Sequence, residues 1–312
     1  MINGILRKFA IIVSALWRRC TEASCCPCCD AKRGRNLGRV RFVFLARSCA
    51  ECGLVYRVPV KLLPNFYQGT YLQETVWWKE YSDGTLRTLM ERDFRGSKWD
   101  YYDKLGIVSA LKVSGRVLDF GGGSGILAYQ LRKLGYDAEV FELGKALAEI
   151  SEGLFGLKTH HDLERLIATR KAAFDVIFAH HVLEHIDDLS LVFNCFSKLL
   201  ADNGLIIVFV PNHGADQWKG FPGATLDSAH VCAFDLKFFN SNMNRFGFNC
   251  VTFSSPYAFR STGQAGNVTQ EGRGPELAMI AWKAGNPPPI ALERWPYALP
   301  DLEDSVRAQA GC

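Results

Sequence analysis

The glycine-rich stretch VLDFGGGSG, residues 117–125, is the first part of the chain that could form a chemical site. It lies between an apolar run of strand length and a periodic segment of helix length. Glycines adopt positive φ and lack a Cβ atom, so this turn lets the backbone approach a flat or extended ligand at the carboxyl edge of a sheet. The turn therefore predicts a site for a nucleoside or a nucleotide.

An acidic residue follows at a suitable distance. Glu142 ends the apolar segment AEVFE, 17 residues past Gly125. A carboxylate there can accept hydrogen bonds from both ribose hydroxyls, in dinucleotide and S-adenosylmethionine sites alike. Gly123, Gly125 and Ala128 also satisfy the looser dinucleotide pattern. A dinucleotide oxidoreductase, and a tight turn that binds no ligand, stay open from these residues alone.

The segment FDVIFAHHVLEHIDDL, residues 174–189, separates these alternatives. It resembles the fourth-strand motif of the class I S-adenosylmethionine-dependent methyltransferases of types 11 and 23, which ends in a pattern like V-L-E-H-I-x-D. The resemblance runs from about residue 100 to residue 283 and includes the glycine turn and Glu142 in the family's order. Agreement between these signals favours a methyltransferase.

The resemblance implies that S-adenosylmethionine is the cofactor. The glycine turn would lie against its methionine part, Glu142 would hold the ribose, and His161 and Asp162 would contact the adenine. The residues that we expect to contact the cofactor are Asp119, Gly121, Gly122, Gly123, Gly125, Glu142, Leu143, His161, Asp162 and His180.

The same resemblance places His180 and His181 against the sulfonium and the substrate, and gives Glu184 and His185 a structural role. Methyl transfer from a sulfonium is an in-line displacement, so a base is needed only if the acceptor carries a proton. Imidazole titrates near neutrality and suits that task. The candidate bases are His180, His181, His213 and His230, with His181 and His230 first.

Nucleic acid is not the expected substrate. The fourth strand ends in Ala-His-His, not in the Asn/Asp-Pro-Pro-aromatic run that methylation of exocyclic adenine or glutamine nitrogens uses, and it offers no cysteine nucleophile for cytosine C5. The net charge of +4, from 36 basic and 32 acidic residues, lacks the field of a dedicated nucleic-acid binder. We expect a small-molecule substrate.

Six of the eleven cysteines lie within residues 25–52. The four that form two C-x2-C pairs nineteen residues apart are Cys26, Cys29, Cys49 and Cys52. Four converging thiolates make a closed, structural zinc site. A first pair in the other register, Cys25 with Cys28, and disulfides stay open as alternatives. A zinc ribbon ahead of a methyltransferase domain resembles bacterial enzymes that modify sugars, lipids or secondary metabolites. We do not expect the additional C-terminal domain of the sugar C-methyltransferases, which argues against that particular substrate.

Residues 1–20, MINGILRKFAIIVSALWRRC, bear on the compartment. The apolar stretch Phe9–Trp17 is too short to span a bilayer, and Arg18 and Arg19 follow it with no small-residue cleavage site. We therefore expect a cytoplasmic protein without a signal peptide or a transmembrane helix. The helical periodicity of this segment predicts an amphipathic helix, which either docks on its own domain or makes a peripheral membrane contact.

From Arg116 onward, apolar runs of strand length alternate with periodic segments of helix length, as in a parallel α/β sheet. The predicted strands are residues 116–119, 138–142, 174–179, 204–210, 248–253 and 277–282, with one more before His161, and the predicted helices are residues 124–134, 144–154 and 189–200. Two β-prone pieces, Val40–Leu45 and Leu54–Val60, lie in the ribbon. The predicted fold is a Rossmann-like, seven-stranded class I methyltransferase sheet with a small N-terminal zinc-ribbon module.

The chain is predicted to have five parts. They are an amphipathic N-terminal segment (1–24), the zinc-ribbon module (25–60), an aromatic-rich helical connector or lid (61–114), the methyltransferase domain (115–284) and a C-terminal tail (285–312). We expect loss of the ribbon to spare the Rossmann-like core. Tyr71, Trp218 and Phe221 are candidates for the substrate wall, or else packing residues.

The predicted function is methyl transfer from S-adenosylmethionine to an oxygen or carbon centre of a sugar, a lipid or a secondary metabolite. Two alternatives from other classes stay open. One is a non-catalytic binding or scaffold protein that keeps the methyltransferase fold, and the other is an NAD(P)-dependent oxidoreductase.

Overall fold

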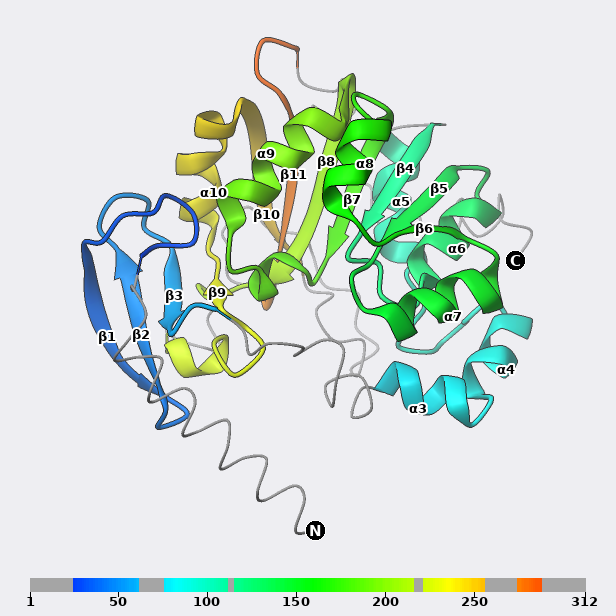
Figure 1. Ribbon diagram of the computed structural model, residues 1–312, viewed down its shortest axis with the longest axis horizontal. Coiled ribbons are helices and arrows are strands. Elements are labelled where there is room, and N and C mark those ends of the chain that lie inside the picture. Colours follow the sequence, from blue (N-terminus) through cyan, green and yellow to red (C-terminus); the bar gives the residue numbers. More distant parts are fainter. Residues whose placement is uncertain (1–24, 62–75, 112–114, 216–220, 256–273, 288–312) are drawn as a thin grey trace.

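A seven-stranded sheet forms the centre of the molecule in the computed structural model, which describes residues 25–61, 76–111, 115–215, 221–255 and 274–287 (Figure 1). Its strands are β4 (Arg116–Phe120), β5 (Asp137–Phe141), β6 (Lys158–His160), β7 (Phe174–His180), β8 (Leu200–Pro211), β10 (Phe248–Ser255) and β11 (Glu276–Lys283). Their order in the sheet is β10-β11-β8-β7-β4-β5-β6. The predicted seven-stranded sheet is confirmed.

The strand directions explain where a ligand can bind. Strands β4 to β8 are parallel, so their carboxyl ends meet at one edge, and the order reverses beside β4. Open α/β sheets bind ligands at such a switch point. Strand β11 is antiparallel to both of its neighbours, β8 and β10. This arrangement differs from the all-parallel six-stranded order of dinucleotide-binding folds.

Helices cover both faces of the sheet. They are α3 (Val76–Ser82), α4 (Thr85–Glu91), α5 (Tyr102–Leu111), α6 (Ile126–Lys133), α7 (Lys145–Phe155), α8 (Leu163–Thr169), α9 (Leu189–Leu199) and α10 (Leu236–Asn242), with short 3-10 turns η1 (Leu183–His185), η2 (Pro222–Ala224) and η3 (Met243–Phe246). Alternate strand residues face opposite sides, so Val117 packs with α4 to α7 and Leu118 packs with α8 to α10.

The cysteine module is a four-stranded antiparallel sheet, seen at the left of Figure 1. It contains β1 (Gly34–Val40), β2 (Phe44–Cys49) and β3 (Val55–Val58), and its fourth strand is β9 (Cys232–Ala233). The β-prone piece Val40–Leu45 does not form one strand, because the hairpin turn between β1 and β2 lies inside it. Arg41 and Phe42 have φ of 51° and 63° there, which no strand residue adopts.

The module is built into the domain instead of standing apart from it. Strand β9 comes from the region after β8, and it pairs Tyr56 with Cys232. Asn242 donates a hydrogen bond from Nδ2 to the carbonyl of Cys52 over 2.9 Å. The buried cysteines of the module share one apolar core with α9 and α10. The expectation that loss of the ribbon spares the Rossmann-like core therefore does not follow from this architecture.

The connector before β4 is helical where it is described. Its aromatic residues Phe94, Trp99 and Tyr102 are buried in the core that α6 and α7 also build. These side chains pack the connector onto the domain. Tyr71 and Trp218 lie outside the described residues, as do the N-terminal segment 1–24 and most of the tail. Among the described residues, no helix is both long and apolar enough to cross a membrane.

Candidate functional site

The glycine turn follows β4 at the carboxyl edge of the sheet. Gly121, Gly123 and Gly125 have φ of 71°, 57° and 84°, a region that side chains with a Cβ atom rarely adopt. A Cβ atom on Gly121 would meet the side chain of Val182 at 2.7 Å, whereas one on Gly123 would meet nothing within 4 Å. The turn is thus tightly packed behind and open at Gly123, which is where a ligand can lie against the backbone.

Glu142 joins the glycine turn to the end of β5. The amide of Gly123 donates to its Oε2 over 3.0 Å, and the amide of Gly144 donates to its Oε1 over 2.5 Å. Burial raises the pKa of Glu142, and these two amides act in the opposite direction. A carboxylate has about four acceptor positions, so two remain for hydroxyl groups of a ribose.

Asp119 is the penultimate residue of β4 and is buried, with 2% of its surface exposed. Its Oδ2 has no hydrogen-bond partner. Burial raises the pKa of Asp119 to about 7. Gly122 is required beside it, because a Cβ atom there would lie 2.5 Å from this oxygen. A buried acceptor without a donor fits a ligand that brings an amino group, as the methionine end of S-adenosylmethionine does.

Of the residues predicted at the cofactor, Leu143 follows Glu142 directly, and His161 and Asp162, the two predicted at the adenine, follow β6. Leu143 is 58% exposed, a large apolar side chain at the edge of the turn. His161 donates from Nδ1 to the carbonyl of Glu142 over 3.1 Å. Asp162 is the N-cap of α8, and its Oδ1 accepts from the amide of Arg165. The structure thus brings His161 to Glu142 and gives Asp162 a structural task that the sequence alone did not indicate.

His181 lies just after β7 between two buried carboxylates. Its Nε2 is 2.8 Å from Oε1 of Glu276, and its Nδ1 is 3.3 Å from Oε1 of Glu184. Burial lowers the pKa of His181, but the hydrogen bonds and charges of the two glutamates outweigh it and raise the pKa to about 9. Its φ of 53° is unusual for a residue other than glycine. At neutral pH this side chain is a cation and has no lone pair to accept a proton.

His180, the last residue of β7, contacts the connector. Lys104 from α5 lies 2.5 Å from its Nε2 and also donates to Oε1 of Glu276 over 2.7 Å. The ring of Tyr101 meets the ring of His180 edge-on at 5.2 Å. Burial, the Lys104 charge and the His181 charge lower the pKa of His180 well below its usual value. His180 is therefore neutral and accepts a hydrogen bond from Lys104.

His230 lies on the loop before β9. Its Nδ1 lies 3.2 Å from the carbonyl oxygen of Thr225. Oδ1 of Asp227 accepts hydrogen bonds from the backbone amides of Ala229 and His230 and so fixes the loop. A neutral imidazole that donates from Nδ1 carries its lone pair on Nε2. The ring packs 4.7 Å from that of His185. Of the two leading candidate bases, His230 is the one whose Nδ1 contacts a backbone carbonyl, whereas the ring of His181 lies between two carboxylates.

Glu184 and His185 tie this loop to the neighbouring backbone. The carbonyl of Glu184 accepts from the amide of Val231 over 2.7 Å, and Nδ1 of His185 donates to the carbonyl of Ala229 over 3.2 Å. His213, a further candidate base, is buried and bonded from Nδ1 to Oγ1 of Thr225. These contacts are structural.

Two charged residues of this cluster were missed from the sequence. Glu276 opens the apolar strand β11 and is fully buried, and Lys104 is 93% buried on α5. An acidic residue at the start of an otherwise apolar strand is a usable signal for Glu276. Lys104 carries no comparable signal, because only the packing of α5 on β7 and β8 brings it to the histidines.

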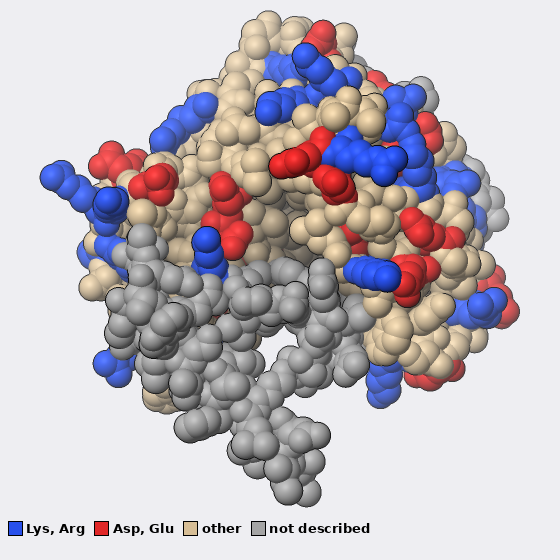
Figure 2. All heavy atoms as spheres, in the orientation of Figure 1, with Lys and Arg blue, Asp and Glu red and all other residues tan. Residues whose placement is uncertain are grey.

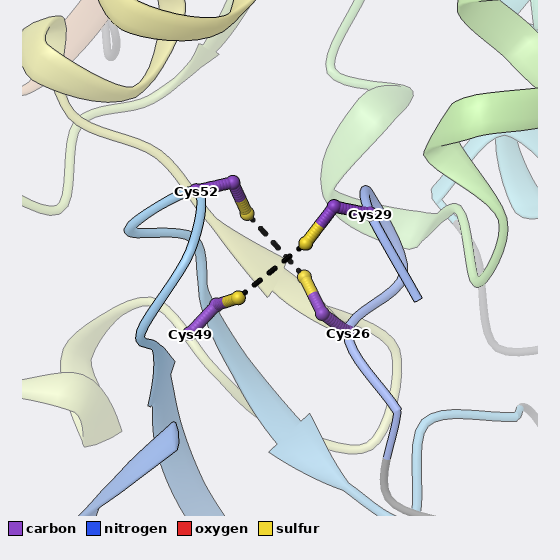
Figure 3. Close-up of side chains that lie close together, drawn as sticks. All are labelled: Cys26, Cys29, Cys49 and Cys52. Atoms are coloured by element: carbon purple, nitrogen blue, oxygen red, sulfur yellow. Dashed lines mark hydrogen bonds between the residues drawn. The ribbon is translucent and has the colours of Figure 1, made fainter. Parts of the chain in front are cut away.

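The four predicted metal ligands converge. Their Sγ atoms all lie within 4.8 Å of one another, with Cys26 3.4 Å from Cys52 and Cys29 3.5 Å from Cys49 (Figure 3). These separations are too long for disulfides and are close to the roughly 3.8 Å between sulfurs on tetrahedral zinc. The donor set therefore fits a zinc ion. The register is Cys26 with Cys29, since Cys25 is not part of the cluster.

Comparison with known sequences gives a family and several relatives. A family model described as a methyltransferase domain matches residues 90–252. The ubiquinone biosynthesis O-methyltransferase of Psychrobacter cryohalolentis is 32% identical over 153 residues, covering 44% of this chain and 59% of the relative. That of Bradyrhizobium diazoefficiens is 30% identical over 122 residues, covering 37% and 46%. The chain thus spans about half to three fifths of the length of these curated relatives.

Comparison with solved structures supports the same fold. A SAM-dependent methyltransferase from Thermotoga maritima, described as a possible histamine N-methyltransferase, aligns with a TM-score of 0.51 at 17% identity, covering 66% of this chain and 98% of the other. At this identity, the likeness concerns the fold of the sheet and its helices.

Proposed function

The chain belongs to the class I S-adenosylmethionine-dependent methyltransferases, and from that premise we propose that it transfers a methyl group to an oxygen of a small molecule. One observation carries the cofactor assignment. The glycine turn is open at Gly123, and it lies between a carboxylate with free acceptor positions, Glu142, and a buried carboxylate oxygen without a donor, on Asp119. Ribose hydroxyls could donate to the free acceptor positions of Glu142, and an amino group could donate to Oδ2 of Asp119.

When bound, S-adenosylmethionine supplies an activated methyl group on a sulfonium. The residues of this chain then have to hold the acceptor in line and keep water out. The cluster around His181 suits that task, because the positive charges of Lys104 and His181 are balanced by the negative charges of Glu276 and Glu184. The distances between the charged atoms are 2.7 to 3.3 Å. A balanced, buried set of charges is rigid and adds no net charge beside a cationic cofactor.

We assign the proton of the acceptor to His230. His181 is held as a cation and His180 is bonded to Lys104, whereas Nδ1 of His230 donates to the carbonyl of Thr225, so Nε2 is the nitrogen that we propose takes the proton. A hydroxyl acceptor would give its proton to that nitrogen as the new oxygen–carbon bond forms and the sulfonium bond breaks. His181 then acts as a positioning residue that fixes Glu184 and Glu276.

The oxygen acceptor is favoured by the relatives, which are named for O-methylation in ubiquinone biosynthesis. We propose a hydroxyl on a ring of a small molecule as the acceptor class. A hydroxyl needs a base, and the chain offers one, whereas a thiol or a free amine would need less help.

Methyl transfer is tested with purified full-length chain, labelled S-adenosylmethionine and a panel of hydroxylated rings, including prenylated phenols. The expected result is labelled methyl ether on at least one ring, with kcat lowered about 100-fold or more in His230→Gln and KM changed little. A matched control is His213→Gln, whose ring is buried on Thr225. Equal losses in both variants would rule against His230 as the base.

The scaffold alternative makes a different prediction. A chain that binds S-adenosylhomocysteine tightly but methylates no member of the panel and no small-molecule extract would favour a binding protein with this fold. Labelled product in any extract would contradict it.

We also propose that Cys26, Cys29, Cys49 and Cys52 hold one structural zinc ion. Four sulfur ligands leave no open coordination position, so the ion would support the fold and take no part in methyl transfer. The convergence of the four sulfurs at zinc-like separations supports this assignment.

A further inference from the structure

The hairpin β1–β2 has an unusual distribution of charge. Residues 31–50 contain six basic side chains and no acidic one. The whole chain has 36 basic and 32 acidic residues, so the remaining 292 residues carry 30 basic and 32 acidic ones. The net positive charge of the protein therefore comes from this hairpin. The six are Lys32, Arg33, Arg35, Arg39, Arg41 and Arg47.

The tip of the hairpin presents an aromatic side chain to solvent. Phe42 is 92% exposed, more than any other large apolar side chain that the structure describes. It stands next to Arg41, and both residues have positive φ in the turn closed by the amide of Val43 and the carbonyl of Val40. Such turns normally take Asn-Gly or Gly-Gly. The backbone is thus held in an unfavourable conformation that points Phe42 outward.

The exposure of Phe42 is not a consequence of loose packing. Its neighbours Val40, Val43 and Phe44 are buried in a small core with Leu226 and Ala233. The base of the hairpin is therefore fixed on the domain, and only the tip projects. Figure 2 shows basic side chains projecting at the left edge of the molecule, where Figure 1 places β1 and β2.

Protection of an edge strand accounts for only part of this pattern. β1 is an edge of its sheet, and charges on an edge prevent pairing with other chains. Charges of either sign would serve that purpose, and an exposed phenylalanine works against it. A flat anionic surface with an apolar interior explains both features, because arginines attract it and the apical ring can enter it.

We propose that the β1–β2 hairpin docks the protein on an anionic lipid bilayer, with Phe42 inserted among the acyl chains and the arginines on the headgroups. A nucleic acid is the less suitable partner, since among the described hairpin residues a single exposed aromatic stands at the apex and offers no stacking groove. The contact does not depend on which acceptor the enzyme methylates.

The test is co-sedimentation of the full chain with phosphatidylcholine vesicles, with and without phosphatidylglycerol. We expect binding only to the vesicles with phosphatidylglycerol, weakening as salt rises. Each arginine near the surface raises the partition coefficient onto an anionic bilayer roughly fivefold. The double variant Arg39→Gln with Arg41→Gln should therefore bind the vesicles about 25-fold more weakly. Phe42→Ser should weaken it on the order of tenfold.

Matched controls keep charge and apolar exposure comparable. Arg87→Gln with Arg92→Gln removes the same charge from exposed positions elsewhere, and Leu191→Gln removes another exposed apolar side chain. Both should bind like the wild type, and unchanged circular dichroism in all variants shows intact folding. Binding that persists in both hairpin variants would move the contact to another segment, such as residues 1–24, and overturn the proposal. Absence of vesicle binding together with hairpin-dependent binding of a single-stranded RNA probe would overturn it in favour of nucleic acid.

Discussion

Glu276 is the residue that organises the charges at the carboxyl end of β7. Its Oε1 lies 2.7 Å from Nζ of Lys104 and 2.8 Å from Nε2 of His181, and the side chain is fully buried. A buried carboxylate is stable only when cations and donors surround it. Because the cations of Lys104 and His181 face the anions of Glu276 and Glu184, the cluster forms a rigid wall beside the glycine turn.

The pH dependence of stability reports on this cluster. The pKa of His181 in the folded protein, about 9, exceeds its ordinary value of 6.5. A group with a raised pKa stabilises the fold fully below its unfolded pKa, and this contribution is lost as pH rises through the folded pKa. We therefore expect the free energy of unfolding to fall between pH 6.5 and pH 9 by at most about 3 kcal/mol, and the thermal midpoint to fall with it. In His181→Gln this slope should be absent, and an unchanged slope would mean that His181 is not held as a cation.

Glu142 gives the most direct test of the cofactor site. Glu142→Ala removes the acceptor for the ribose and for the Gly123 amide, so affinity for S-adenosylhomocysteine should fall about 10–100-fold in calorimetry. Glu149→Ala, an exposed acidic residue of α7, is the matched control and should leave affinity unchanged. Equal affinity in both variants would show that the ribose lies elsewhere.

At the scale of elements, β9 links the cysteine module to the candidate base. Two residues pair it with β3, and the residue before it, Val231, donates its amide to the carbonyl of Glu184. The amide of Leu189, at the start of α9, donates to the carbonyl of Pro27 over 3.0 Å. The loop that carries Cys26 and Cys29 therefore holds the start of α9, and the segment that enters β9 holds Glu184.

Loss of the metal should consequently destabilise the whole chain and not the zinc-ribbon module alone. Cys49→Ser with Cys52→Ser is expected to release about one zinc ion per chain, measured by mass spectrometry of the metal, and to lower the thermal midpoint of the whole chain by more than about 5 °C. Cys25→Ser is the control that should keep the ion. A ribbon that melts alone while the core keeps its wild-type midpoint would contradict this coupling, and a metal-free wild type would remove the zinc assignment.

At the scale of the whole molecule, the antiparallel strand β11 between β8 and β10 marks a methyltransferase sheet and not a dinucleotide sheet. The strand also carries Glu276 at its first residue, directly opposite Pro211 at the end of β8. The same topology thus sets the fold class and delivers a buried charge to the site.

Ligand stabilisation follows from this assignment. A ligand that binds only the folded chain at about 100 times its Kd adds about 2.7 kcal/mol to the free energy of unfolding. S-adenosylmethionine and S-adenosylhomocysteine should each raise the thermal midpoint, whereas NAD at equal concentration should not. A shift with NAD alone would restore the oxidoreductase alternative.

The sequence by itself determined the sheet, the glycine turn, Glu142 and the two cysteine pairs, because each rests on short-range patterns of glycine, charge or sulfur along the chain. Helix ends moved by only one or two residues, as α6 and α7 illustrate. The turn inside the β-prone piece Val40–Leu45 was not predicted, because an Arg-Phe turn in the left-handed region has no propensity signal.

Two features depend on the tertiary structure alone. They are the protonation of His180 and His181 and the packing of the zinc-ribbon module into the core of the domain. Lys104, His181 and Glu276 are far apart in the sequence, and only their packing at one sheet edge makes His181 a cation and leaves His230 as the proposed base. Likewise, β9 joins the ribbon across about 180 residues of chain, so no local pattern could have shown that the two units share a core. Long-range contacts set the local dielectric and the charge partners, and these are what fix a pKa or bind two units together.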